Sequence, residues 1–161
     1  MKKNLFLSVA IIALASLLAT NVQAQDSKFS LGGGIAYATE IESTGLYAKG
    51  ILYFTPQWEG ALTGTYYLEE GVTLFGIDAD AHYLFYNNEE NMIVYTITGL
   101  NLLSLKLDGY DSATNVGINL GVGMRYQLSE TISLNPALKY ILGTESGGSY
   151  FGLSVGLCFN F

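Results

Sequence analysis

The feature that most constrains this chain is an alternation of apolar residues with polar or small ones, repeated in eight runs. A period of two is typical of a β-strand whose two faces meet different surroundings. In the fourth run, for example, the apolar Ile77 and Ala79 flank the charged Asp78. The runs, separated by turn-forming residues, are 30–38, 45–55, 58–66, 73–86, 92–104, 116–128, 132–142 and 151–161.

The residues opposite the apolar stripe decide which face of these strands meets lipid. They are mostly Gly, Ser, Thr and Asn, and only 13% of the chain is charged, against about 25% in a typical soluble domain. A Lys or Arg facing the middle of a bilayer costs roughly 2–4 kcal/mol. All charged residues within the runs lie opposite the stripe, and they are Lys49, Glu59, Asp78, Asp80, Arg125 and Lys139.

These patterns predict an all-β fold, an eight-stranded antiparallel up-and-down transmembrane β-barrel with its apolar faces outward. The barrel must close because lipid offers no partner for an open sheet edge. Small residues then fill a lumen that is just wide enough for side chains. In the run from 92 to 104, Tyr95 and Ile97 belong to the face that we expect to meet lipid.

Aromatic residues of the apolar stripe gather at the ends of the runs, as in the interfacial girdles of membrane barrels. An even number of strands places both chain termini on one side of the membrane, expected to be periplasmic. The aromatics expected near that side are Phe54, Trp58, Phe85, Tyr126, Phe159 and Phe161, and those near the opposite side are Tyr37, Tyr66 and Phe151.

Residues 1–24 have the three parts of a secretory signal peptide. Two lysines precede an uncharged apolar run over residues 5–19, and residues 22–24 form a small-residue cleavage site. A retained transmembrane anchor is the weaker alternative, because the apolar run is shorter than the roughly 20 residues of a spanning helix. We expect cleavage between Ala24 and Gln25 and one barrel domain over residues 25–161.

The segments between the runs carry most of the acidic charge. Those expected outside the cell are 39–44, 68–72, 105–114 and 143–149, with periplasmic turns near 55–57, 87–91 and 129–131. The formal net charge is −7, and it becomes −9 once Lys2 and Lys3 leave with the signal peptide. Such a balance argues against nucleic acid, whose binding needs Lys and Arg against phosphates. The external loops remain as a surface for an extracellular partner.

Two positions interrupt the alternation. Leu102 and Leu103 are consecutive apolar residues, so we expect a bulge or a register change there. Pro136 has no N–H to donate, and a closed barrel has no free edge to accommodate it, so we expect a second bulge at this residue. The lone Cys158 excludes an intramolecular disulfide and is interpreted as a small filler of the lumen.

Three segments carry a family resemblance: the glycine-rich 31–37, the repeat 117–123, and the last run with its terminal Phe161. Over residues 25–161 the chain resembles the small outer-membrane β-barrel proteins, the OmpA/OmpX-like barrel domain. The resemblance implies contact with outer-membrane lipid. It also implies that the outer-membrane barrel assembly machinery reads Phe159 and Phe161 as a C-terminal signal. No peptidoglycan-binding domain follows residue 161, which argues against a cell-wall tether.

Seven inward residues are candidates for chemistry: Lys49, Glu59, Asp78, Asp80, His82, Arg125 and Lys139. The resemblance implies a lumenal plug of ion pairs, because unpaired charge in a narrow lumen is costly. A proton- or ion-conducting path is the alternative. A metal site at Asp78, Asp80 and His82 is disfavoured, since three ligands along one strand make a poor tetrahedral cage.

Catalysis is disfavoured as well, and no cofactor is expected. The only histidine has no Ser neighbour on its face to serve as a nucleophile, and no G-x-S-x-G motif occurs. The leading hypothesis is therefore an integral outer-membrane protein that is not an enzyme and acts structurally or through its external loops. A narrow porin-like channel for small solutes or ions is the second hypothesis. A soluble periplasmic lipocalin-like binding barrel is the third.

Overall fold

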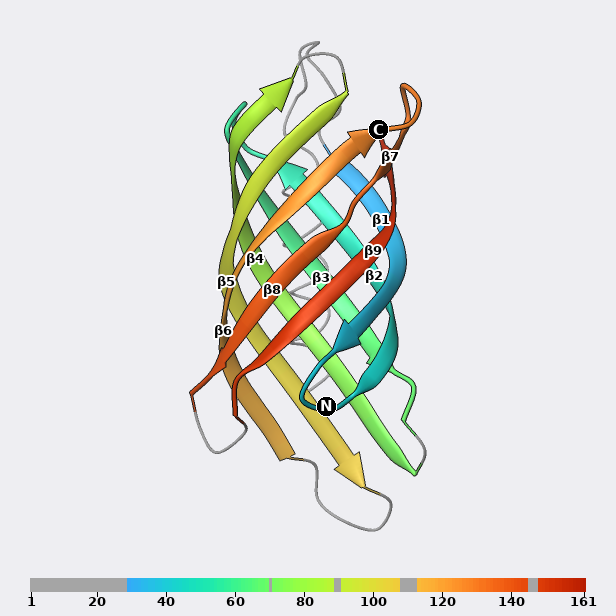
Figure 1. Ribbon diagram of the computed structural model, residues 1–161, viewed down its shortest axis with the longest axis vertical. Coiled ribbons are helices and arrows are strands. Elements are labelled where there is room, and N and C mark those ends of the chain that lie inside the picture. Colours follow the sequence, from blue (N-terminus) through green and yellow to red (C-terminus); the bar gives the residue numbers. More distant parts are fainter. Residues whose placement is uncertain (1–28, 70, 89–90, 108–112, 145–147) are drawn as a thin grey trace, which may run out of the picture.

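In the computed structural model the strands wind into an elongated barrel (Figure 1). The structure describes residues 29–69, 71–88, 91–107, 113–144 and 148–161. No helix among these residues is long and apolar enough to cross a membrane. The strands are β1 (Phe29–Ala38), β2 (Ser43–Tyr53), β3 (Trp58–Tyr67), β4 (Val72–Asn88), β5 (Met92–Leu107), β6 (Ala113–Gln127), β7 (Ile132–Leu134), β8 (Ala137–Gly143) and β9 (Tyr150–Asn160).

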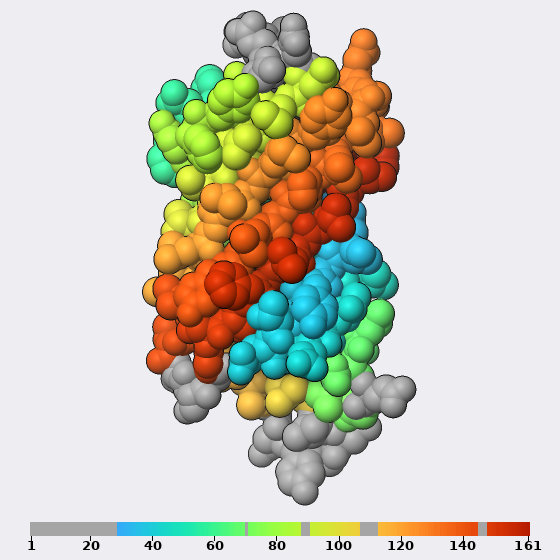
Figure 2. Space-filling view, in the orientation of Figure 1, coloured from blue at the N-terminus to red at the C-terminus, as the bar shows by residue number. Residues whose placement is uncertain are grey.

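The sheet closes on itself because its first strand pairs with its last. β1 runs antiparallel to β9 from Ser30, opposite Asn160, to Ala38, opposite Gly152, and Figure 2 shows the two strands side by side, blue against red. Beyond this seam the Phe161 N–H donates to the Phe29 carbonyl at 3.1 Å. The rings of Phe29 and Phe161 stack with their centroids 5.0 Å apart.

β7 and β8 are two halves of one barrel strand. Both pair with β6 on one side and with β9 on the other, in the same register before and after the gap. The nine segments therefore make eight antiparallel barrel strands with up-and-down connections. This confirms the predicted fold class.

The two ends of the barrel differ. One end, here called the turn end, holds the β2–β3, β4–β5 and β6–β7 connections and Phe161, at the top of Figure 1. The opposite end, here called the loop end, holds the other connections. Parts of the segments 68–72, 87–91, 105–114 and 143–149 lie outside the described residues. The expected cleavage site at Ala24 and Gln25 lies outside them as well.

The outer wall of the barrel is apolar. Large exposed apolar side chains come from every barrel strand, among them Leu31, Leu46, Leu62, Ile77, Leu100, Leu120, Leu138 and Leu153. The aromatics assigned to the strand ends are all exposed as well, from 38% for Tyr37 to 69% for Phe54. Soluble monomers rarely expose apolar patches larger than a few hundred Å², so an apolar surface that extends over every barrel strand is unusual for a soluble monomer. The prediction that the apolar faces point outward is confirmed.

One strand faces the other way from our expectation. Tyr95 and Ile97 of β5 are buried inside the barrel, whereas Leu100 and Leu102 lie on the outer wall. The predicted bulge at Leu102–Leu103 is wrong, because both residues keep regular pairing with β4 and β6. The two leucines point to opposite faces, as neighbouring residues of a regular strand must.

A bulge does occur, but in β4. The pairing with β5 steps from Leu84 opposite Tyr95 to Tyr86 opposite Val94, so Phe85 is the inserted residue. Phe85 and Tyr86 are both exposed on the outer wall, at 54% and 47%. A bulge lets consecutive residues share a face, and here it adds a second aromatic ring to the turn-end girdle.

Pro136 interrupts the strand without the bulge that we predicted. The register is unchanged from β7 to β8 on both sides, so no residue is inserted. The Pro136 carbonyl accepts a hydrogen bond from the Met124 N–H at 2.9 Å, but proline cannot donate one in return. The Asn135 side chain donates to the Met124 carbonyl instead, through Nδ2 at 3.3 Å. A side-chain amide thus replaces the missing backbone donor.

Candidate functional site in the barrel lumen

The seven polar residues singled out in the sequence all point into the lumen. They are Lys49 of β2, Glu59 of β3, Asp78, Asp80 and His82 of β4, Arg125 of β6 and Lys139 of β8. Each is buried except Lys139, whose side chain is 15% exposed. Three carboxylates thus share the lumen with two lysines, one arginine and one histidine. The structure divides six of these residues into two clusters and places Lys49 between the two.

The turn-end cluster consists of Glu59, His82 and Arg125. The register of β3 with β4 places Glu59 directly opposite His82, and Arg125 reaches the same carboxylate from β6. Glu59 Oε1 lies 2.8 Å from His82 Nδ1 and 2.6 Å from Arg125 Nη2. One carboxylate oxygen therefore serves two nitrogen donors in a site closed to solvent.

Aromatic rings surround this cluster. The His82 ring stacks on Tyr95 with centroids 4.5 Å apart. The Arg125 guanidinium lies 5.6 Å from the ring centres of both Tyr53 and Tyr95, within the range of a cation–π interaction. The Tyr53 hydroxyl in turn shares a hydrogen bond of 2.7 Å with Ser30 Oγ. The cluster is thereby connected to the β1–β9 seam.

Three polar atoms of the turn-end cluster lack a hydrogen-bond partner among the described residues. They are Glu59 Oε2, His82 Nε2 and Arg125 Nε. Most buried polar groups in proteins are paired, so three unpaired atoms in three neighbouring side chains mark this cluster as incompletely coordinated.

The mid-lumen cluster is built around Asp78 and Asp80. Lys139 Nζ lies 2.8 Å from Asp78 Oδ2 and 3.4 Å from Asp80 Oδ2. Asn119 Nδ2 donates to Oδ1 of both aspartates, at 2.9 and 2.7 Å, and Asn101 Nδ2 donates to Asp78 Oδ1 at 2.8 Å. All four carboxylate oxygens therefore have a partner.

Lys49 lies between the clusters. Its Nζ donates to Asn135 Oδ1 at 3.2 Å and lies 5.5 Å from the centre of the Tyr47 ring. Asn135 also donates through Nδ2 to the Tyr95 hydroxyl at 2.8 Å. Asn135 is fully buried. Its side-chain amide connects the interrupted strand with Lys49 and with Tyr95, whose ring stacks on His82.

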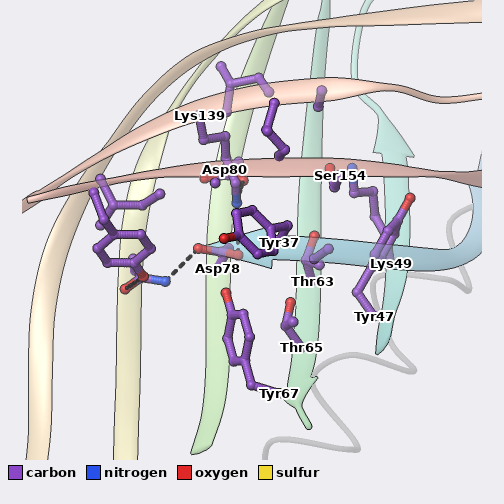
Figure 3. A pocket seen from close by; sticks show the side chains of 18 residues that line it. Tyr37, Tyr47, Lys49, Thr63, Thr65, Tyr67, Asp78, Asp80, Lys139 and Ser154 are labelled. Atoms are coloured by element: carbon purple, nitrogen blue, oxygen red, sulfur yellow. Dashed lines mark hydrogen bonds and ion pairs between the residues drawn. The ribbon is translucent and has the colours of Figure 1, made fainter. Parts of the chain in front are cut away.

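A cavity of about 30 Å³ lies beside the mid-lumen cluster, and Figure 3 shows Lys49, Thr63, Asp78, Asp80 and Lys139 around it. One water molecule needs a cavity of roughly 10–15 Å³, so this cavity can hold about two waters. Ligand pockets are far larger, at roughly 300–1,000 Å³. The cavity is therefore a place for water rather than for an organic ligand.

Apolar side chains fill the lumen toward the loop end. Ala38, Tyr67, Leu74, Ile141 and Tyr150 form one buried cluster, here called the loop-end cap. The Tyr150 hydroxyl donates to Asn101 Oδ1 at 3.4 Å and so connects the cap to the mid-lumen cluster. From the loop end to the turn end, the lumen holds an apolar cap, a cluster whose carboxylate oxygens are all paired, and a cluster whose carboxylate is only partly paired.

The residues considered for a metal site are separated. Asp78 and Asp80 contact Lys139, whereas His82 contacts Glu59. Within the described ranges, no group of three or more His, Cys, Asp or Glu side chains is arranged to hold a metal ion. The contacts that these side chains do make are ion pairs and hydrogen bonds.

Sequence reasoning missed the uncharged residues that complete both clusters, namely Tyr95, Asn101, Asn119 and Asn135. Asn119 and Asn135 stand on the face that we had already assigned to the lumen, so a search of that face for amides would have found them. Tyr95 and Asn101 belong to β5, whose facing was predicted wrongly. The signal for that strand was its pair of outward leucines, Leu100 and Leu102.

Solved structures with the same fold are small outer-membrane barrels. The N-terminal β-barrel domain of Pseudomonas aeruginosa OprF matches with a TM-score of 0.69 and 19% identity, over 85% of this chain and 100% of that one. Ail, the attachment invasion locus protein of Yersinia pestis, in complex with the heparin analogue sucrose octasulfate, matches at 0.63 and 13%, over 85% and 100%. Neisserial surface protein A matches at 0.60 and 21%, over 86% and 100%.

No protein-family model and no curated protein sequence matches the chain. The fold and the surface nevertheless define its class. The closed eight-stranded ring and the apolar outer wall are those of the small outer-membrane β-barrels with the OmpA/OmpX-like fold.

Proposed function

We propose that this protein is a non-enzymatic outer-membrane barrel with a closed lumen, acting structurally or through the surface of its loop end. The observation that carries the proposal is the filling of the lumen by two charge clusters and the loop-end cap. A hydrated ion would have to displace paired side chains to pass. Removing one partner of a buried ion pair costs about 3–5 kcal/mol, which makes spontaneous opening at neutral pH rare.

Planar-bilayer recording of the folded protein at pH 7.5 tests the closed lumen. We expect a silent bilayer after insertion has been verified by a heat-dependent shift of gel mobility. The competing hypothesis is a narrow cation channel, which the cavity beside Asp78 and Asp80 favours. Reproducible, cation-selective conductance steps that lose selectivity in Asp80→Asn would support the channel and contradict the closed lumen.

The loop end is proposed to face the outside of the cell and to meet an extracellular partner through segments 39–44, 68–72, 105–114 and 143–149. Ail was crystallised with a polyanionic heparin analogue. The loop segments here carry Glu40, Glu42 and Glu69, with Lys106 as a basic exception, so their charge favours a neutral or cationic partner. Calorimetric titration with sucrose octasulfate should give no binding heat, and measurable binding would contradict this assignment.

We also propose how the protein is exported and assembled. Residues 1–24 serve as a cleaved signal peptide, and the outward rings of Phe159 and Phe161, 45% and 60% exposed, are read by the barrel assembly machinery. Mass spectrometry of the envelope protein should find Gln25 at its start, and deletion of Phe161 should lower the folded yield. Recovery from the periplasm without detergent would favour the lipocalin-like alternative, which does not fit the apolar outer wall.

A further inference from the structure

We propose that the turn-end cluster is an acid-sensitive seal, in which protonation of His82 loosens the contact between Arg125 and Glu59 and admits water to that end of the lumen. The inference rests on the proposed closed lumen and adds a condition under which one end of it opens. It follows from the way in which three buried side chains share a single carboxylate oxygen.

The first step concerns the proton. His82 is the only histidine of the chain, and histidine is the side chain that changes charge near neutral pH. When the neutral ring donates from Nδ1 to Glu59 Oε1, its Nε2 carries a free lone pair and has no partner among the described residues. An added proton therefore goes to Nε2.

The second step is repulsion between the protonated His82 ring and the Arg125 guanidinium. With His82 protonated, two cations share Glu59, whose side chain is fully buried, and repulsion between like charges is strong where water is excluded. The nearest carboxylate on the same strand face, Asp80, is already bonded to Asn119 and Lys139. Among the residues that the structure describes, the other ionisable groups facing this end of the lumen are Lys49 and Tyr53 of β2, Tyr95 of β5 and Cys158 of β9. None of them supplies a second negative charge at neutral or acidic pH.

The third step is the movement of one of the two cations away from Glu59. The His82 ring is held on one side by Glu59 and stacks on Tyr95. Arg125 has a long side chain with an unpartnered Nε, and it lies two residues before the end of β6. Arg125 is therefore the cation that leaves, toward the turn end. The mid-lumen cluster has no histidine and stays closed.

The chain carries its own reporter for this change. Cys158 is its only cysteine, it is fully buried, and it lies opposite Ser133 in the same third of the barrel. The measurement is the rate at which an uncharged, water-soluble pyridyl disulfide modifies Cys158 in the folded, lipid-reconstituted protein between pH 7.5 and 5.5. The control is His82→Gln, which cannot acquire the charge. At each pH the wild-type rate is divided by the His82→Gln rate, and this ratio cancels the pH dependence of the thiol itself.

We expect this ratio to rise on acidification, by up to roughly tenfold per pH unit, the limit for one linked proton. A ratio that stays constant across the range would overturn the seal. If His82→Gln does not fold, nuclear magnetic resonance of the wild type decides instead. The His82 ring and the Arg125 guanidinium signals should then shift together with pH, and titration of His82 with an unchanged Arg125 would overturn the proposal.

The two proposals fail separately. Steady conductance at pH 7.5 contradicts the closed lumen itself. A silent barrel whose Cys158 reactivity ratio does not respond to pH contradicts the seal and leaves the closed lumen standing.

Discussion

In the middle of the lumen, two aspartates share one lysine and two asparagines, whereas near the turn end one glutamate serves both an arginine and a histidine. Both arrangements hold carboxylates out of water. The first leaves no carboxylate oxygen unpaired and has its one unpaired atom on the neutral amide of Asn119, whereas the second leaves an unpaired atom on each of its three ionisable side chains.

The difference shows what neutral amides contribute in a narrow lumen. Asp78 and Asp80 lie two residues apart on the same face, where like charges repel. Asn119 donates to both and adds hydrogen bonds without adding charge, so one lysine suffices. Within the described part of the chain, the turn-end cluster has no amide of this kind among its contacts, and its stability depends on the charge of each member. Substitutions in the two clusters should therefore have different costs.

The largest effect is expected for Glu59→Gln, which keeps the shape of the side chain but leaves Arg125 as an uncompensated buried charge. Loss of one partner of a buried ion pair costs about 3–5 kcal/mol. Urea unfolding in lipid vesicles, followed by the fluorescence of Trp58, measures the change. The matched control is the double variant Glu59→Gln/Arg125→Gln, which should recover most of the loss. A single variant as stable as the wild type would contradict the assigned ion pair.

An intermediate effect is expected for Asn135→Ala, because this amide serves Lys49, Tyr95 and the Met124 carbonyl. Leaving buried polar groups without partners costs roughly 1–3 kcal/mol. Adding Pro136→Ala returns a backbone N–H opposite Met124 and should recover part of that loss in the same unfolding assay. No recovery would mean that Asn135 does not replace the donor that proline lacks.

The smallest effect is expected for Asp80→Asn. Asp78 keeps Lys139 at 2.8 Å, so this lysine retains a carboxylate partner, and the loss should be about 1 kcal/mol, the net value of one hydrogen bond. Asp78→Asn is the comparison variant and should cost more, since Asp78 accepts from Asn101, Asn119 and Lys139. A cost for Asp80→Asn equal to that of Glu59→Gln would remove the distinction between the clusters.

Much of this architecture could be predicted from the sequence, because membrane strands must separate lipid-facing from lumen-facing residues. The parity of Lys49, Glu59 and Arg125 placed them inside the barrel without any structural information. The grouping into two clusters could not be predicted in the same way. It depends on the stagger between strands, which sets Glu59 opposite His82 and brings Lys139 to Asp78.

The two errors in β5 have a common physical origin. In β5 the apolar residues change sides: Tyr95 and Ile97 fill the lumen, and Leu100 and Leu102 meet lipid. A rule that sends apolar residues outward therefore assigned the first half of the strand wrongly and required a bulge to explain the second half. The bulge at Phe85 left no mark in the sequence, since both Phe85 and Tyr86 suit a membrane interface.

The seam between β1 and β9 has a consequence for the order of events during folding. It joins Ser30 to Asn160, which are 130 residues apart, and contacts of such long sequence separation form slowly. Until this last pair of strands meets, two rows of backbone groups lack partners, and hydrocarbon cannot supply them. A partly paired sheet is therefore unstable inside the bilayer. Crossing the membrane and closing the cylinder become a single step, whose timing is set by the arrival of the final strand.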